Sequence, residues 1–199
     1  MPATTTIGAS VAVHDSTSRR ADVGGQAACP VDGTPSPQTG TAETAYLSGF
    51  DALTGEMNRV HMMEVLEATI EEAVKLRSSS GFLLAAVDNL GRINEAYGFD
   101  IADEVIVEVG KRIRRQLRGK DHLGRFSGNK FGIILKTCTP DDMLIAAERL
   151  LAGVREEVVQ TTAGPVAVTI TIGGVTGPRH GRNLREILTR AQDALDGAK

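Results

Sequence analysis

The chain has 199 residues, of which 41% are hydrophobic and 24% charged, so we expect one domain with one ordinary core and a possible tail. A formal net charge of -3 provides no field that would hold a long polyanion, which argues against nucleic acid but leaves small nucleotides open. The two cysteines show no CxxC spacing, and no histidine cluster lies near them, so neither a disulfide framework nor a metal site is indicated. No apolar run reaches the length of a membrane span, and we therefore expect a cytoplasmic protein that does not bind membranes.

The first 45 residues consist mainly of Thr, Ser, Ala, Gly and Pro, with scattered charges. They show no helical or strand periodicity and have few apolar side chains to bury. We predict a disordered tail over residues 1–45 and a folded domain over residues 46–199.

The remaining sequence alternates helical and strand patterns. Apolar residues at helical spacing predict helices over 58–76, 101–117, 140–154 and 184–195. Apolar or β-branched runs predict strands over 82–87, 123–126, 131–135 and 166–172, with a tight hairpin between the second and third. The order combines local hairpin pairing with crossovers, so we expect an α+β fold in which helices cover a sheet.

Five segments in a fixed order carry a family resemblance that spans residues 50–199. They are Asp51–Arg59 (DALTGEMNR), Ile93–Asp103 (with INE, YG and a final Asp), Arg125–Phe131 (RFSGNKF), Val168–Gly173 (VTITIG) and Ala191–Lys199 (AQDALDGAK). Together they resemble the GGDEF (diguanylate cyclase) family. The resemblance implies a nucleotidyl-cyclase-like fold with a central, mostly antiparallel sheet flanked by helices.

In that family two GTP-loaded domains meet, and the 3′-hydroxyl of one nucleotide attacks the α-phosphate of the other to form cyclic di-GMP. Divalent metal held by carboxylates supports this phosphoryl transfer. The family places one acid at the end of the first strand and others at the third and fourth hairpin positions, where this chain has Ala86, Asn129 and Lys130. We therefore expect no catalytic residue and no resident metal, with Mg²⁺ present only if GTP brings it.

One carboxylate survives near these positions. Asp88 follows Ala86 by two residues, so it points to the same side of the strand but lies roughly 6 to 7 Å further along. Asp88 is therefore no simple substitute for the missing metal ligands. Gly91 replaces a lysine of the family, and Ser127 replaces the first glycine of the hairpin, where a β-carbon would obstruct close approach of phosphate.

Other parts of a nucleotide site are retained. The resemblance assigns guanine recognition to Asn94 and Asp103, and phosphate contacts to Gly128 and Lys199, with Asp88 nearby. From the residues alone, an Asn and an Asp nine positions apart are equally compatible with helix capping and solvation. The chain ends at Lys199, before the basic segment of the family, which suggests a truncated protein.

A second motif lies five residues before the hairpin motif. Arg118 and Asp121 form an RxxD whose position resembles the inhibitory site of the family, which binds cyclic di-GMP, and Arg149 matches a helper arginine. An arginine can form bidentate bonds to phosphate and stack on a purine. The alternative is an ordinary surface ion pair between Arg118 and Asp121.

Four hypotheses follow. The first is a non-catalytic domain that binds cyclic di-GMP; the second is a GTP-binding regulatory module of a GGDEF–EAL phosphodiesterase. An active cyclase and a purely structural pairing domain are the third and fourth. The expected partners are thus cyclic di-GMP or GTP and, for assembly, a second copy or a partner GGDEF or EAL domain.

Overall fold

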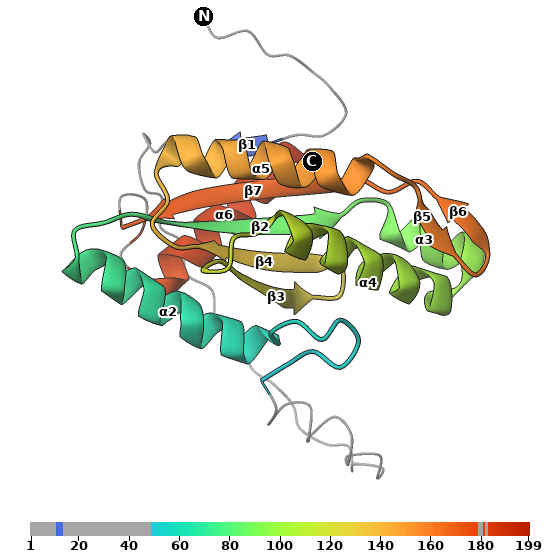
Figure 1. The fold of residues 1–199 in the computed structure, drawn as a ribbon, viewed down its shortest axis with the longest axis horizontal. Helices are drawn as coiled ribbons and strands as arrows, with labels where there is room; N and C mark the ends of the chain where they lie inside the picture. The colour runs from blue at the N-terminus through green and yellow to red at the C-terminus, as the bar shows by residue number, and fades with distance from the viewer. Residues whose placement is uncertain (1–10, 14–48, 179–180, 182) are drawn as a thin grey trace, which may run out of the picture.

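The computed structural model describes residues 11–13, 49–178, 181 and 183–199. A five-stranded sheet forms the centre, and helices cover both of its faces (Figure 1). The elements in chain order are β1 (Val11–Val13), α2 (Arg59–Lys75), β2 (Ser80–Val87), α3 (Leu90–Tyr97), α4 (Phe99–Gln116), β3 (His122–Ser127), β4 (Lys130–Leu135), α5 (Pro140–Arg155), β5 (Val159–Thr161), β6 (Gly164–Val166), β7 (Ile170–Gly177) and α6 (Leu184–Ala198).

The strand order in the sheet is β1-β7-β2-β4-β3. The β2 strand lies in the centre and is antiparallel to both β4 and β7, while β3 is antiparallel to β4. Only β1 runs parallel to its neighbour, β7. The predicted α+β class with a mostly antiparallel sheet is confirmed.

The core has two layers because successive side chains of a strand point to opposite faces. In β2, Leu83 and Ala85 pack with α4 and α5, whereas Leu84 and Ala86 pack with α2 and α6. All eight residues of β2 are buried. A strand covered on both faces has no reason to alternate apolar and polar residues, which explains its continuous apolar run.

Glycine allows α6 to lie close to β7. A β-carbon on Gly173 would lie 2.2 Å from the backbone nitrogen of Leu195, closer than atoms can approach. The packing of α6 therefore requires a residue without a side chain at this position.

The segment before α2 covers the outer edge of β3. Met57 forms a parallel bridge with Gly124: the amide of Met57 donates to the carbonyl of Leu123 (3.3 Å), and the amide of Arg125 donates to the carbonyl of Met57 (2.8 Å). The backbone groups of this edge are thus partly used within the chain.

The structure corrects three predictions about elements. Residues 90–97 form helix α3, which the sequence pattern did not reveal because eight residues with one buried apolar side chain, Ile93, give little periodicity. The strand predicted over 166–172 is divided: β6 ends at Val166 and β7 begins at Ile170 and continues to Gly177. Glycine-rich β7 was under-predicted because glycine lowers strand propensity.

The third correction concerns the tail. Val11–Val13 form β1, so the prediction of disorder is wrong for these three residues. The rest of residues 1–45 lies outside the described residues. None of the described helices is long and apolar enough to cross a membrane.

Candidate functional site

The three residues of the predicted cyclic di-GMP site line one cavity. Arg118 and Asp121 lie in the connection between α4 and β3, and Arg149 projects from α5. The cavity has a volume of about 110 Å³. Its other lining residues are Leu135, Lys136, Thr137, Cys138, Asp142, Ile145 and Ala146. Residues separated by up to 31 positions in the sequence are thus brought to one place.

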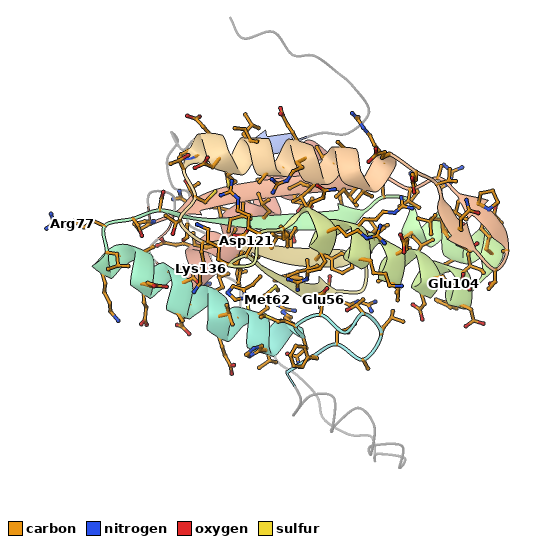
Figure 2. All side chains as sticks on the ribbon, in the orientation of Figure 1. Glu56, Met62, Arg77, Glu104, Asp121 and Lys136 are labelled. Atoms are coloured by element: carbon orange, nitrogen blue, oxygen red, sulfur yellow. The ribbon has the colours of Figure 1, made fainter. Side chains whose placement is uncertain are left out.

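Asp121 holds the backbone of this site together. Its side chain is buried, and its two carboxylate oxygens accept hydrogen bonds from the backbone amides of Arg118 (3.1 Å) and Lys136 (3.3 Å). Figure 2 shows Asp121 and Lys136 near each other. Within the described part of the chain, the Arg118 guanidinium forms no ion pair with Asp121, so the surface ion pair considered as an alternative is not formed.

The electrostatics of the cavity favour an anion. Arg118, Lys136 and Arg149 contribute three cationic groups, and the two carboxylates of the cavity, Asp121 and Asp142, accept hydrogen bonds from backbone amides and from Thr139. Lys136 also lies 3.6 Å from a carboxylate oxygen of Glu72, a pair that is partly exposed and weak. Two arginines on different elements can therefore bind the same anionic ligand.

Two further groups of the cavity have fixed protonation states near neutral pH. Burial raises the pKa of the Cys138 thiol to about 11, so the thiol stays protonated and unreactive. Hydrogen bonds from Thr139 lower the pKa of Asp142, which caps the N-terminus of α5. The sequence did not indicate that either residue belongs to the site. Lys136 was also missed, because it comes to lie beside Asp121 only through the antiparallel pairing of β4 with β3.

The positions at which the family resemblance leads us to expect acidic residues lie at the end of β2 and at the β3–β4 turn. Ala86 is fully buried and pairs directly with Lys130 across the β2–β4 ladder. The Lys130 ammonium donates to Oε1 of Gln192 in α6 (3.0 Å), and Gln192 in turn donates to the carboxylate of Asp196 (2.9 Å). A methyl group and a cation thus occupy this face of the sheet.

The remaining polar groups at this end of β2 are used within the protein. Nδ2 of Asn129 donates to the carbonyl of Val87 (3.3 Å), which ties the hairpin turn to β2. The carboxylate of Asp88 accepts from the hydroxyls of Thr169 and Thr171, both at 2.7 Å. No group of three His, Cys, Asp or Glu side chains that could hold a metal occurs among the described residues. These side chains do not fit a divalent metal site.

The predicted guanine-reading residues lie on neighbouring helices. Asn94 lies within α3 and Asp103 in the second turn of α4, while the residues preceding these helices are Asn89 and Gly98. The capping alternative for Asn94 and Asp103 is therefore wrong. Oδ1 of Asn94 is buried and has no hydrogen-bond partner among the described residues. Such an orphaned acceptor is costly unless a ligand or water satisfies it.

The two residues predicted to contact phosphate, Gly128 and Lys199, do not share a described cavity with Asn94 and Asp103. The carbonyl of Gly128 accepts from Arg125 (2.9 Å), and Arg125 also pairs with Asp51 (3.2 Å), so the turn is anchored to the segment before α2. Burial raises the pKa of Asp51, but the hydrogen bonds from Thr54 and the Arg125 charge outweigh it and lower the pKa overall. Lys199 is exposed and follows α6. No described cavity unites Asn94, Asp103, Gly128 and Lys199.

Comparison with known proteins agrees with the motifs. The family model "Diguanylate cyclase, GGDEF domain" matches residues 48–199. The bifunctional diguanylate cyclase/cyclic di-GMP phosphodiesterase MucR of Pseudomonas aeruginosa is 28% identical over 157 residues, which cover 79% of this chain and 23% of MucR. The probable diguanylate cyclase DgcT of Escherichia coli is 30% identical over 162 residues, covering 78% of this chain and 34% of DgcT.

A solved structure of a GGDEF domain is also similar to this chain. The GGDEF domain of TpbB (YfiN) from Pseudomonas aeruginosa superposes with a TM-score of 0.73 at 28% identity, covering 75% of this chain and 88% of the other. The chain spans less than half the length of the curated relatives described above. Motifs, topology and the match over residues 48–199 lead to one conclusion: the chain belongs to the GGDEF domain family.

Proposed function

We propose that this domain is a receptor for cyclic di-GMP that lacks diguanylate cyclase activity. The observation that carries the proposal is the cavity lined by Arg118, Asp121 and Arg149. Ala86 and Lys130 support the absence of cyclase activity, because neither side chain can bind the divalent metal that phosphoryl transfer requires.

The chemistry of the cavity suits a cyclic dinucleotide. The guanidinium groups of Arg118 and Arg149 can bind phosphate oxygens in a bidentate manner or stack on a purine. A cavity of about 110 Å³ is smaller than the ligand, so one part enters and the rest lies on the surface between the α4–β3 connection and α5. The backbone at Arg118 and Lys136 is already fixed by Asp121, so binding orders few additional groups.

The relatives support the same class of ligand. The names of MucR and DgcT describe enzymes that make cyclic di-GMP or, for MucR, also degrade it. We infer that this domain recognises the same nucleotide through Arg118, Asp121 and Arg149 without producing it.

Calorimetric titration with cyclic di-GMP and with GTP tests the proposal. Because a charge-assisted hydrogen bond contributes about 1.5 to 3 kcal/mol, Arg118→Ala should weaken cyclic di-GMP binding by roughly ten- to a hundredfold and leave GTP binding nearly unchanged. Arg149→Ala should have a similar effect. Arg185→Ala, an exposed arginine of α6, is the matched control. Absence of cyclic di-GMP binding to the wild type, or equal losses for both nucleotides, would refute the receptor function.

A second candidate is a GTP-binding regulatory module. The buried, unpartnered Oδ1 of Asn94 favours it, because the amino group or ring N–H of a guanine would supply the missing donor. Asn94→Ala should then weaken GTP binding and leave cyclic di-GMP binding at Arg118 unchanged. The reverse pattern of losses would reject this alternative.

A further inference from the structure

Helix α3 also forms one wall of a second, larger cavity, which we call the α3 cleft. Its volume is about 520 Å³, within the range of small-molecule sites. It is open to solvent and lies between α3, the end of α5 and the segment that joins β6 to β7. Its lining residues are Asp88, Asn89, Arg92, Ile93, Ala96, Tyr97, Arg155, Glu157, Val158, Ala167, Val168 and Thr169.

The α3 cleft includes Asp88 but neither Asn94 nor any residue that lines the cavity of Arg118 and Arg149. Arg92 and Ala96 lie one turn apart on the same face of α3, whereas Asn94 lies two residues from each and thus about 200° around the helix axis from Arg92. The cavity of Arg118 and Arg149 shares no lining residue with the cleft. A ligand in the cleft would therefore contact neither Asn94 nor Arg118 from this side.

Two arginines line the cleft together with the acidic residues Asp88 and Glu157. Arg92 comes from α3 and Arg155 from the last turn of α5, and both are exposed. Neither forms a hydrogen bond or ion pair with another described residue. Unpaired guanidinium groups that reach one cleft from two elements are suited to a phosphate group.

The rest of the cleft suits a planar ring. Tyr97 leaves 53% of its surface exposed, and the buried Ile93 and Val168 form an apolar floor. Asp88 is held in place by the hydroxyls of Thr169 and Thr171 and keeps lone pairs that can accept from a ring amino group. An aromatic side chain, two buried apolar side chains and a fixed acceptor thus line the same cavity as the two arginines.

We propose that the α3 cleft binds a nucleoside monophosphate, with the base against Tyr97 and the phosphate between Arg92 and Arg155. Inorganic phosphate would use the arginines alone, and an apolar compound would leave both guanidinium groups without a partner. Only a ligand that combines a heterocycle with a phosphate engages all of these groups.

Titration of the full chain with AMP tests the proposal, because adenine does not offer the donor edge by which guanine would be read at Asn94. Wild type should bind AMP, and adenosine should bind at least tenfold more weakly because it lacks the phosphate. Arg92→Ala and Arg155→Ala should each weaken AMP binding about tenfold, and the double variant should show no measurable binding. Arg185→Ala should bind AMP like the wild type.

Three results would overturn the proposal. The first is the absence of AMP binding to the wild type at millimolar concentration. The second is equal affinity for AMP and adenosine, which would show that no phosphate site exists. The third is loss of AMP binding in Asn94→Ala with retention in Arg92→Ala, which would place the nucleotide on the other side of α3. Thermal unfolding of each variant verifies that these surface substitutions leave the fold intact.

Discussion

Ala86 and Lys130 are direct neighbours across the β2–β4 ladder, so a buried methyl group and an ammonium-bearing side chain share one face of the sheet. Divalent cations bind to sites with several carboxylate oxygens. A lysine in this place repels a metal ion and attracts an anion. Both consequences can be measured.

The first prediction is that the protein forms no cyclic di-GMP from GTP in the presence of Mg²⁺ or Mn²⁺. Ala86 and Asn129 offer no carboxylate, and Asp88 is bound by two threonine hydroxyls. Product formation is measured by chromatography against a blank without protein. Turnover that disappears in Asp88→Ala would contradict the prediction and would show that Asp88 binds the metal.

The second prediction is that GTP binding does not depend on divalent metal. The Lys130 ammonium, held 3.0 Å from Gln192, can neutralise phosphate charge without an ion. Dissociation constants measured with EDTA and with Mg²⁺ should agree within about threefold, because no described acidic cluster retains the metal.

Lys130→Met tests whether the Lys130 ammonium neutralises the phosphate charge of GTP. The variant keeps the aliphatic stem and lacks the charge, so GTP binding without metal should weaken about tenfold. A wild-type protein that binds GTP only with Mg²⁺ would show that the metal, and not Lys130, neutralises the phosphates.

The third prediction concerns stability. Arg112 of α4 is buried and donates to the carbonyl oxygens of Val154 (2.8 Å) and Val158 (3.1 Å) and also to that of Glu157. Val154 lies in the last turn of α5, where helix carbonyls have no partner within the helix, and Glu157 and Val158 lie in the segment that joins α5 to β5.

Arg112→Met should lower the free energy of unfolding by about 3 kcal/mol, because the carbonyl groups of Val154, Glu157 and Val158 lose a donor that is itself buried. Lys111→Met, at the exposed neighbouring position, should change it by less than about 0.5 kcal/mol. Denaturant unfolding followed by circular dichroism measures both. Equal effects of the two substitutions would show that Arg112 does not stabilise the end of α5.

The fourth prediction is a loss of stability below neutral pH that depends on His122. Burial lowers the pKa of His122 from 6.5, and the charges of Lys136 and Arg114 lower it further, against the opposing effect of Asp121. The unfolded chain therefore takes up the proton first as the pH falls. This contribution to stability is complete above pH 6.5 and is lost as the pH falls from 6.5 through the lower folded-state pKa.

His122→Gln should reduce the slope of unfolding free energy against pH in that window. The depressed pKa of Asp51 acts in a different window, because its contribution is lost only as the pH falls below 3.8. An unchanged slope between pH 7 and pH 5 in the variant would mean that His122 does not titrate differently in the folded and unfolded states.

The sequence predicted the parts of the fold that repeat a local pattern. Helix α4 and strand β2 were found because their apolar residues follow the helical and the buried-strand patterns over many positions. Helix α3 and the pair β5–β6 were missed, since each is short and is held by tertiary contacts. The hairpin of β5 and β6, for example, is tied to α4 by Glu104, which accepts from the amide (2.8 Å) and hydroxyl (2.6 Å) of Thr162 (Figure 2 labels Glu104).

The residues of the candidate site could be predicted from the sequence only where they belong to one short motif. The RxxD spacing indicated Arg118 and Asp121, but the role of Lys136 depends on the return of β4 beside the α4–β3 connection. The α3 cleft is formed by three segments far apart in the sequence, and no periodicity relates Arg92 to Arg155. Orphaned acceptors such as Oδ1 of Asn94 are also invisible until the burial of each atom is known.

The bridge between Met57 and Gly124 bears on how two copies of the domain could associate. Because the amide of Arg125 and the carbonyl of Leu123 already bond to Met57, β3 offers fewer free backbone groups to a strand from another molecule. Joining two sheets into one continuous sheet at this edge would first require the segment before α2 to be displaced. Association of this domain with a second copy or with another domain is therefore expected to use side chains on its helices, not strand addition at β3.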